Sequence, residues 1–319
     1  MDVRRILGNS AIMMTLSFIV AMATGGFPDW IGLTNSNIAM LSLMVMMSLS
    51  LTNLKLRGLK LGSHTSPILR SFALSFGIGS GILILAAFLF QGDLRSGWII
   101  VAAVPSAVSV VPFCYLMRGE LESTLVSSAA LYIAALALTP LLTLAFLGHA
   151  VDVVLLLTYV GLLILLPMGL SRPLRRLNIA QDDKAAGINV AFFALIVAVA
   201  GPNRQVFFND WTLLSGLLAV AIFRVFAVGM IWNWYLRRKS TPRARVVPEV
   251  LFITHKNTGM AATLALALIG PAAAVPATVC AVIDITWLIF LSQRLFKVEG
   301  RPNSDGEAIR ERSSITPGK

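Results

Sequence analysis

The chain has 319 residues, of which 57% are hydrophobic and only 13% are charged, and its mean hydropathy is +0.81. A soluble domain of this size needs far less apolar sequence, and here the apolar residues come in runs of about eighteen or more. The net charge of +11 does not indicate nucleic-acid binding, because the basic residues gather in short segments between these runs and in the tail. The composition therefore predicts an all-α membrane protein that crosses the lipid bilayer several times.

Cysteine and histidine residues give no sign of a disulfide framework or a metal site. Cys114 and Cys280 both lie inside apolar runs, and His64, His149 and His255 are scattered along the chain. Paired carboxylates and nucleophile–base sets are also missing from the sequence pattern. We therefore expect no enzyme activity, no metal and no cofactor.

The hydropathy pattern predicts ten membrane crossings. They cover residues 6–24, 35–53, 67–90, 96–117, 121–147, 152–170, 186–201, 210–236, 246–269 and 272–295. A cleaved signal peptide is the alternative for the first crossing, since residues 21–23 read Ala-Met-Ala, although this apolar run is longer than a usual signal sequence. Residues 297–319 are polar and contain Gly, Pro and Ser, which predicts a disordered cytoplasmic tail.

Basic residues alternate between the loops and predict the orientation. The loops after the second, sixth and eighth crossings hold Lys55, Arg57, Lys60, Arg172, Arg175, Arg176, Lys184, Arg237, Arg238, Lys239, Arg243 and Arg245. The alternate loops, which follow the first, third, fifth, seventh and ninth crossings, hold at most a single arginine, Arg95 or Arg204. Because cytoplasmic loops carry the excess of Lys and Arg, both termini are expected in the cytoplasm and the chain in the cell (inner) membrane.

The ninth crossing contains polar residues at its centre, namely His255, Lys256, Asn257 and Gly259. A cation near the bilayer centre costs about 3 kcal/mol, and Asn and Gly are residues at which a helix stops and restarts. Polar side chains at a helix break predict a cavity-lining binding site, because unpaired backbone groups cannot face lipid. The alternative is a buried polar cluster that only ties helices together.

The fourth crossing is interrupted in a similar way, by Pro105 and Pro112 with Ser106 and Ser109 between them. These breaks fall in the fourth of five crossings and the ninth of ten, which predicts two inverted five-helix repeats, residues 1–149 and 150–296. Paired broken helices point to a transporter site at the repeat interface. The candidate substrate-binding residues are Ser106, Ser109, Thr254, His255, Lys256, Asn257, Thr258 and Gly259.

These features resemble the bile acid:sodium symporter superfamily, which also includes arsenite efflux permeases. The resemblance rests on the ten crossings, the two breaks and three short segments. The segments are Pro105 with Tyr115-Leu116-Met117-Arg118-Gly119, Asn257-Thr258-Gly259-Met260-Ala261, and Gly270-Pro271-Ala272-Ala273-Ala274-Val275-Pro276. The resemblance implies a core domain of crossings three to five and eight to ten. A panel domain of crossings one, two, six and seven would stand beside it, with the substrate between them.

The chain departs from the family at the positions that bind sodium. Val110 and Val111 stand where symporters carry a Ser-Asn pair, Phe252 replaces the acidic ligand, and Lys256 replaces a glutamine. Thr124 and Ser128 match hydroxyl ligands of the fifth crossing, but hydroxyls without a carboxylate or amide make a poor sodium cage. The arsenite branch carries a cysteine where this chain has Ser106, and Cys114 lies two turns further on.

Lys256 offers a substitute for the missing cation, because its ammonium would lie where the family binds sodium. A buried lysine can also release its proton and act as a proton carrier. Glu249, seven residues earlier, is the nearest candidate counter-charge by sequence, so Lys256 could instead be a structural strut to Glu249 or to backbone carbonyls. Arg224 and Asp284 lie inside the eighth and tenth crossings, and we expect them to form a structural ion pair.

The sequence thus predicts a permease that moves a small organic anion by alternating access, with possible proton or weak sodium coupling. Anions suit Lys256 and the positive ends of half-helices. Two alternatives remain: a sodium-coupled symporter of bile-acid type, and a membrane sensor or degenerate paralogue that transports nothing.

Overall fold

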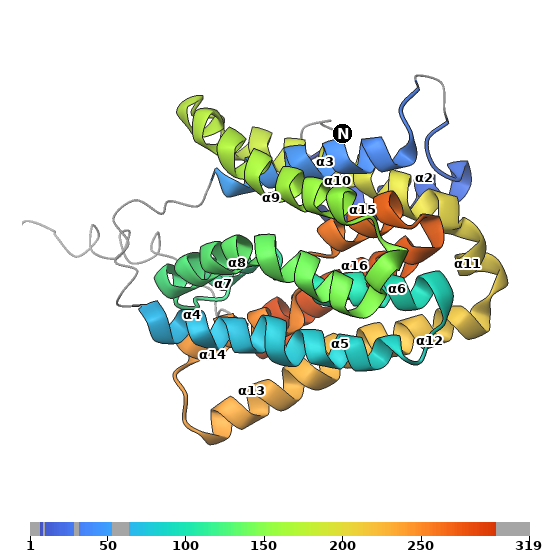
Figure 1. Cartoon of the computed structure of the whole chain (residues 1–319). Helices are drawn as coiled ribbons and strands as arrows, with labels where there is room; N and C mark the ends of the chain where they lie inside the picture. Colours follow the sequence, from blue (N-terminus) through green and yellow to red (C-terminus); the bar gives the residue numbers. More distant parts are fainter. Residues whose placement is uncertain (1–6, 9, 29–31, 53–63, 298–319) are drawn as a thin grey trace, which may run out of the picture.

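The computed structural model describes residues 7–8, 10–28, 32–52 and 64–297, and every regular element within these ranges is a helix (Figure 1). The all-helical class is therefore confirmed for this part of the chain. The disordered tail expected for 297–319 lies outside the described residues except for Lys297, as do Lys55, Arg57 and Lys60.

Four helices pack against one another as one layer, here called the four-helix layer. They are α2 (Ser10–Thr24), α3 (Asn35–Leu51), α9 (Val153–Arg176) and α10 (Gln181–Ala200). Local capping fixes where two of them begin. Thr34 accepts from the backbone N–H of Asn37 at 3.3 Å, and Asp152 accepts from that of Leu155 at 2.9 Å. After α10 the chain continues through η4 (Gly201–Asn203) and α11 (Arg204–Asn209).

The remaining helices form a second group, here called the core group, most of which lies in the lower part of Figure 1, with α15 reaching up beside α9 and α10. It contains α4 (Thr65–Phe72), η2 (Ala73–Gly79), α5 (Ser80–Ala87), α6 (Gly92–Ala103), α7 (Val110–Leu116), α8 (Leu121–Leu147), η3 (Gly148–Ala150), α12 (Trp211–Ile222), η5 (Phe223–Ala227), α13 (Val228–Arg238), α14 (Arg243–Thr254), α15 (Thr258–Leu268), α16 (Pro271–Phe290) and η6 (Leu291–Leu295). The segments η2 and η5 are π-helical, and each continues directly into the next α-helix.

Within the described ranges, six continuous helical stretches are long and apolar enough to cross a membrane. They are Thr65–Ala87, Leu121–Leu147, Val153–Arg176, Gln181–Asn209, Trp211–Arg238 and Pro271–Leu295. The expected span 121–147 coincides with α8, and the expected spans 67–90 and 210–236 differ from the observed stretches by a few residues. These lengths and compositions suggest insertion into a membrane.

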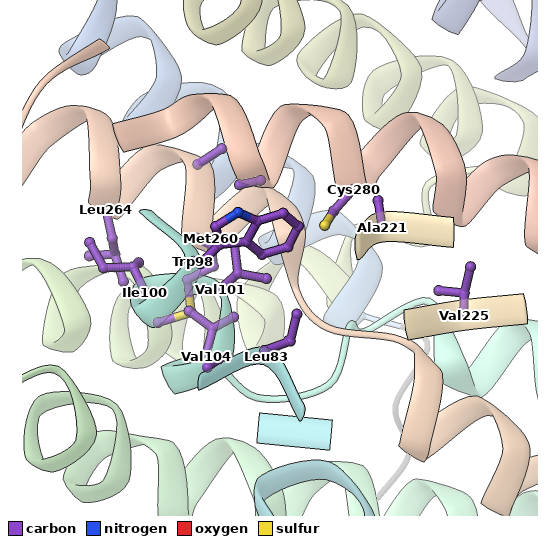
Figure 2. Close-up of a cluster of buried hydrophobic side chains, with 14 of the residues drawn as sticks. Leu83, Trp98, Ile100, Val101, Val104, Ala221, Val225, Met260, Leu264 and Cys280 are labelled. Atoms are coloured by element: carbon purple, nitrogen blue, oxygen red, sulfur yellow. The ribbon is translucent and has the colours of Figure 1, made fainter. Parts of the chain in front are cut away.

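Apolar side chains from several core helices meet around Trp98 of α6. Figure 2 shows Leu83 of α5, Met260 of α15 and Cys280 of α16 near the α6 residues, with Val225 of η5 further away in the same cluster. Gly97 lets α6 approach α16 closely, because a Cβ atom there would overlap the carbonyl oxygen of Ala273. This packing holds the broken helix α6–α7 against α15 and α16.

Basic residues of the described chain gather at one end of the molecule. Arg175 and Arg176 lie in the last turn of α9, and Arg237 and Arg238 in the last turn of α13. These turns and the beginning of α4 lie toward the left of Figure 1. The molecule therefore has one strongly basic end, here called the basic end.

Candidate functional site

The two interrupted helices meet at their breaks. Helix α6 ends at Ala103 and α7 begins at Val110, while α14 ends at Thr254 and α15 begins at Thr258. An isolated antiparallel bridge pairs Ser106 with Lys256 across the two breaks, and the N–H of Asn257 donates to the carbonyl oxygen of Pro105 at 2.8 Å. Backbone groups exposed by one break are thus satisfied by the other.

Asn257 holds this crossing in place through its side chain. Its Oδ1 accepts from the N–H of Met260 at 3.0 Å and so caps the start of α15. Its Nδ2 donates to the hydroxyl of Tyr132 on α8 at 2.8 Å. Both side chains are buried, so the amide locks the break to the neighbouring helix.

Lys256 points into the end of the other broken helix. Its Nζ donates to the carbonyl oxygens of Ala102 at 3.0 Å and Val104 at 2.9 Å, and to the hydroxyl of Ser80 at 2.8 Å. The ring centroid of Phe76 lies 4.9 Å away. The C-terminal carbonyls of a helix carry partial negative charge, so they are a natural site for a cation.

The three neighbours of Nζ can all accept hydrogen bonds. The hydroxyl of Ser80 also lies 2.6 Å from Ala102 O and 3.2 Å from Ser75 O, so it can donate to one of these carbonyl oxygens and accept from Lys256. Nζ then has three acceptors, which match the three donors of an ammonium. Protonated Lys256 is thus a cation tethered at the end of α6.

Glu249 is not the partner of Lys256, which corrects the expectation from sequence spacing. Its Oε1 accepts from Arg245 Nε at 3.1 Å and lies 3.7 Å from Arg70 Nε. Residues seven apart share a face only on a continuous helix, and α14 ends at Thr254 before Lys256 is reached. The carbonyl form of the strut is the one present.

Arg224 occupies the end of the second broken helix. It lies on η5, its Nη1 donates to the carbonyl oxygen of Thr254 at 2.8 Å, and its Nη2 is paired with Asp284 of α16. Both charged side chains are buried. The ion pair expected from the sequence is present, and it also caps α14. Each broken helix therefore ends against a cation of the protein itself.

Two candidate residues face the packed interior rather than a cavity. Ser106 Oγ donates to Ser75 Oγ at 2.8 Å, and Thr254 Oγ1 donates to Val250 O at 2.7 Å while accepting from Trp287 Nε1 at 3.1 Å. Neither lines the large cavity described next. Their hydroxyls are already hydrogen-bonded to other groups of the protein, which differs from the substrate-binding role expected for them.

A cavity of about 1130 Å³ lies between the four-helix layer and the core group. The layer contributes Met46, Met47, Lys184, Asn189 and Phe192 to its walls, and the core group contributes Ser109, His255, Lys256, Asn257, Thr258, Gly259 and Asp284. Arg175 and Gln181 also line it, so the cavity runs from the breaks toward the basic end. Six of the eight candidate substrate residues therefore meet at one cavity.

The comparisons with known proteins, made against protein-family models and curated proteins, find no match. What the site does is therefore inferred from its own geometry.

The hydroxyls considered for sodium lie away from the cavity. Thr124 Oγ1 donates to Glu120 O at 2.6 Å and lies 3.2 Å from Cys114 Sγ. Ser128 Oγ is buried without a hydrogen-bond partner in the described part of the chain. Within that same part, no three His, Cys, Asp or Glu residues come together as a metal site.

Three residues of the site carry no clear signal in the sequence. Ser80 and Tyr132 lie in long apolar spans, and only the tertiary contacts with Lys256 and Asn257 give them a role. Lys184 counts toward the basic loop in the sequence, but in the structure it is buried in the cavity wall. Because Lys184 follows two aspartates at the start of a helix, the sequence alone does not distinguish it from an exposed loop lysine.

Proposed function

We propose that this chain is a secondary transporter that moves a small organic anion across a membrane, and that its cavity opens to each side in turn. The observation that carries the proposal is the cavity between two helix groups, which ends at the crossing of two broken helices. Non-helical backbone at membrane depth is tolerated where it is buried in protein or lines a cavity, and both conditions hold here. Discontinuous helices that meet at such a site are typical of secondary transporters.

Matched positions support the proposed organisation into ten crossings and two inverted repeats of the kind found in the bile acid:sodium symporter superfamily. The third and eighth crossings each contain a π-helical segment, η2 and η5. Each of these crossings brings a polar side chain to a break: Ser80, directly after η2, reaches Lys256, and Arg224 within η5 reaches Thr254 O. π-Bulges are frequent at functional sites.

The tethered cations support transport that does not depend on sodium. A sodium ion at the end of α6 would need the carbonyl oxygens of Ala102 and Val104, which already accept from Lys256. It would also stand beside an ammonium, and like charges a few ångströms apart repel by about 4 kcal/mol at an effective dielectric constant of 20. The guanidinium of Arg224 excludes a cation from the end of α14 in the same way.

A labelling experiment tests alternating access without a known substrate. Ser109 lines the cavity, and the native thiols Cys114 and Cys280 are buried, so Ser109→Cys would be made in a Cys114→Ala/Cys280→Ala background. A membrane-impermeant maleimide is added to right-side-out and to inside-out vesicles. We expect Ser109→Cys to react from both sides, whereas the exposed control Lys239→Cys reacts from the cytoplasmic side alone.

Reaction of Ser109→Cys from one side only would contradict alternating access and favour a sensor or another protein that does not transport. A separate experiment measures the flux of radiolabelled organic anions, including a bile acid and short monocarboxylates, in proteoliposomes made with the wild-type protein. Efflux driven by an anion gradient in choline buffer is the expected result.

A further inference from the structure

Lys184 is a buried cation without a visible counter-charge. It lies in the first turns of α10, the residue as a whole is 9% exposed, and it lines the cavity. Its side chain makes no hydrogen bond or ion pair with any of the residues that the structure describes. The neighbouring Asp182 and Asp183 are exposed and form no ion pair with it.

The other buried cations in the described ranges have partners within the protein, although Nε of Arg224 has none. Lys256 has three acceptors, and Arg224 has Asp284 and the carbonyl oxygen of Thr254. The half-buried Arg175, also in the cavity wall, donates to the carbonyl oxygens of Thr52 and Leu51 at 3.0 and 3.4 Å. Burying an unpaired charge is costly, so a fold keeps one where another molecule supplies the partner.

The geometry points to Lys184 as the residue that binds the anionic group of the transported molecule, and this inference rests on the transport function proposed above. An ammonium at the cavity wall has three donors for a carboxylate or sulfonate. Lys256 does not take this role, although the sequence suggested it, because its donors are already used by Ser80, Ala102 and Val104.

The position of Lys184 also indicates how the transported molecule lies in the cavity. Leu195 is level with the break, because its Cδ2 lies 3.3 Å from the position of a Cβ on Gly259. Lys184 is eleven residues earlier on α10 and therefore about 16 Å closer to the basic end. Between them, Ile188 and Phe192 follow Lys184 at four-residue intervals and also line the cavity. A ligand with its charge at Lys184 would lay an apolar body along this strip toward Gly259.

Such a ligand touches both helix groups, since Lys184 belongs to the four-helix layer and Gly259 to the core group. Lys184 would therefore be a specificity-determining residue that admits monoanions and disfavours their neutral analogues. A neutral molecule of the same shape would leave the ammonium buried and unpaired.

The test uses the full chain in lipid nanodiscs, with 4-phenylbutyrate as the anionic probe and 4-phenylbutanamide as its neutral analogue. Tryptophan fluorescence during heating reports the melting temperature, because a ligand that binds the native state raises it. We expect 4-phenylbutyrate to stabilise the wild-type protein and the amide to do so far less. In Lys184→Met the affinity for 4-phenylbutyrate should fall by about 10- to 100-fold, while Lys184→Arg retains it.

A purely structural role would give different results. Without ligand, Lys184→Met should melt at the wild-type temperature or above, because an unpaired buried charge is removed. A lower melting temperature would show that Lys184 has a partner within the protein and would overturn the inference. The exposed control Lys239→Met should bind 4-phenylbutyrate as the wild-type protein does.

The failure of this inference is distinguishable from the failure of the proposed function. Equal stabilisation of the wild-type and Lys184→Met proteins by 4-phenylbutyrate would overturn the role of Lys184 but leave transport standing. Absence of any stabilisation of the wild-type protein by this anion would also overturn the role of Lys184, and labelling at Ser109→Cys would still decide alternating access on its own.

Discussion

Lys256 Nζ donates a 2.9 Å hydrogen bond to the carbonyl oxygen of Val104, the residue directly after helix α6. The ninth predicted crossing thus supplies the cation that caps the broken fourth crossing. The end of a helix attracts a cation, and here that cation is covalently part of the chain. A permanently bound charge cannot leave with a substrate, which separates this site from one that exchanges a metal ion.

Replacing Lys256 should cost stability in proportion to the donors that are lost. Lys256→Met removes the ammonium from Val104 O and Ser80 Oγ and leaves Ala102 O with only the hydroxyl of Ser80 as donor, so we expect a loss of about 2–4 kcal/mol in the free energy of unfolding. Lys256→Gln retains an amide donor and should lose less. The measurement is denaturant unfolding in mixed micelles. In a double-mutant cycle with Glu249→Leu, the two losses of stability should be additive. A strong coupling between them would show that Lys256 does pair with Glu249.

Sodium should not stabilise or drive the wild-type protein. We expect equal melting temperatures and equal anion flux in sodium and choline buffers, because Lys256 occupies the carbonyls at the end of α6. A complete and sodium-specific loss of flux in choline would contradict this. The combined variant Val110→Ser, Val111→Asn, Phe252→Glu and Lys256→Gln introduces the side chains that bind sodium in the symporters this sequence resembles, and it should gain sodium-dependent stabilisation.

Arg224 and Asp284 should behave as a coupled pair with one additional task. Either single change, Arg224→Met or Asp284→Leu, should cost about 3–5 kcal/mol, because it leaves a buried charge unpaired. The double change should recover most of this loss. A destabilisation of about 1–3 kcal/mol should remain in the double variant, because the carbonyl oxygen of Thr254 loses its donor. Additive single effects in a cycle measured by unfolding would rule out the coupling.

Close packing of α6 on α16 predicts a difference between two glycines. Gly97→Ala should lower the melting temperature, because its Cβ would overlap the backbone carbonyl of Ala273, which has little room to move. Gly81→Ala is the matched control, since a Cβ there meets nothing within 4 Å and alanine favours the helix by about 1 kcal/mol. If both variants melted alike, the close approach of the two helices would be refuted.

The basic end of the molecule should face the cytoplasm. Arg176, Arg238 and Arg243 lie at this end, and positive residues are retained on the cytoplasmic side. We therefore expect a peptide tag after Lys319 to be detected by antibody only in permeabilised cells. Detection of the tag on intact cells would reverse the predicted orientation.

The sequence alone predicted the features of this protein that depend on local chemistry. Apolar run length predicted the span 121–147, which is α8, and Pro105 and Asn257 marked the two breaks where helices do stop. The opposite charges of Arg224 and Asp284 predicted their pairing, because each alone is costly in an apolar segment. These features depend on a residue and its near neighbours, so the sequence alone determines them.

Only the tertiary structure decided which groups meet. Lys256 bonds to Ser80 and Val104, more than a hundred residues away, rather than to Glu249, because the break turns its side chain off the helix face. Lys184 looks like any basic loop residue until packing buries it in a cavity wall. Hydropathy and helix-breaking chemistry act along the chain, whereas the partner of a buried charge depends on distances that only the packed helices establish.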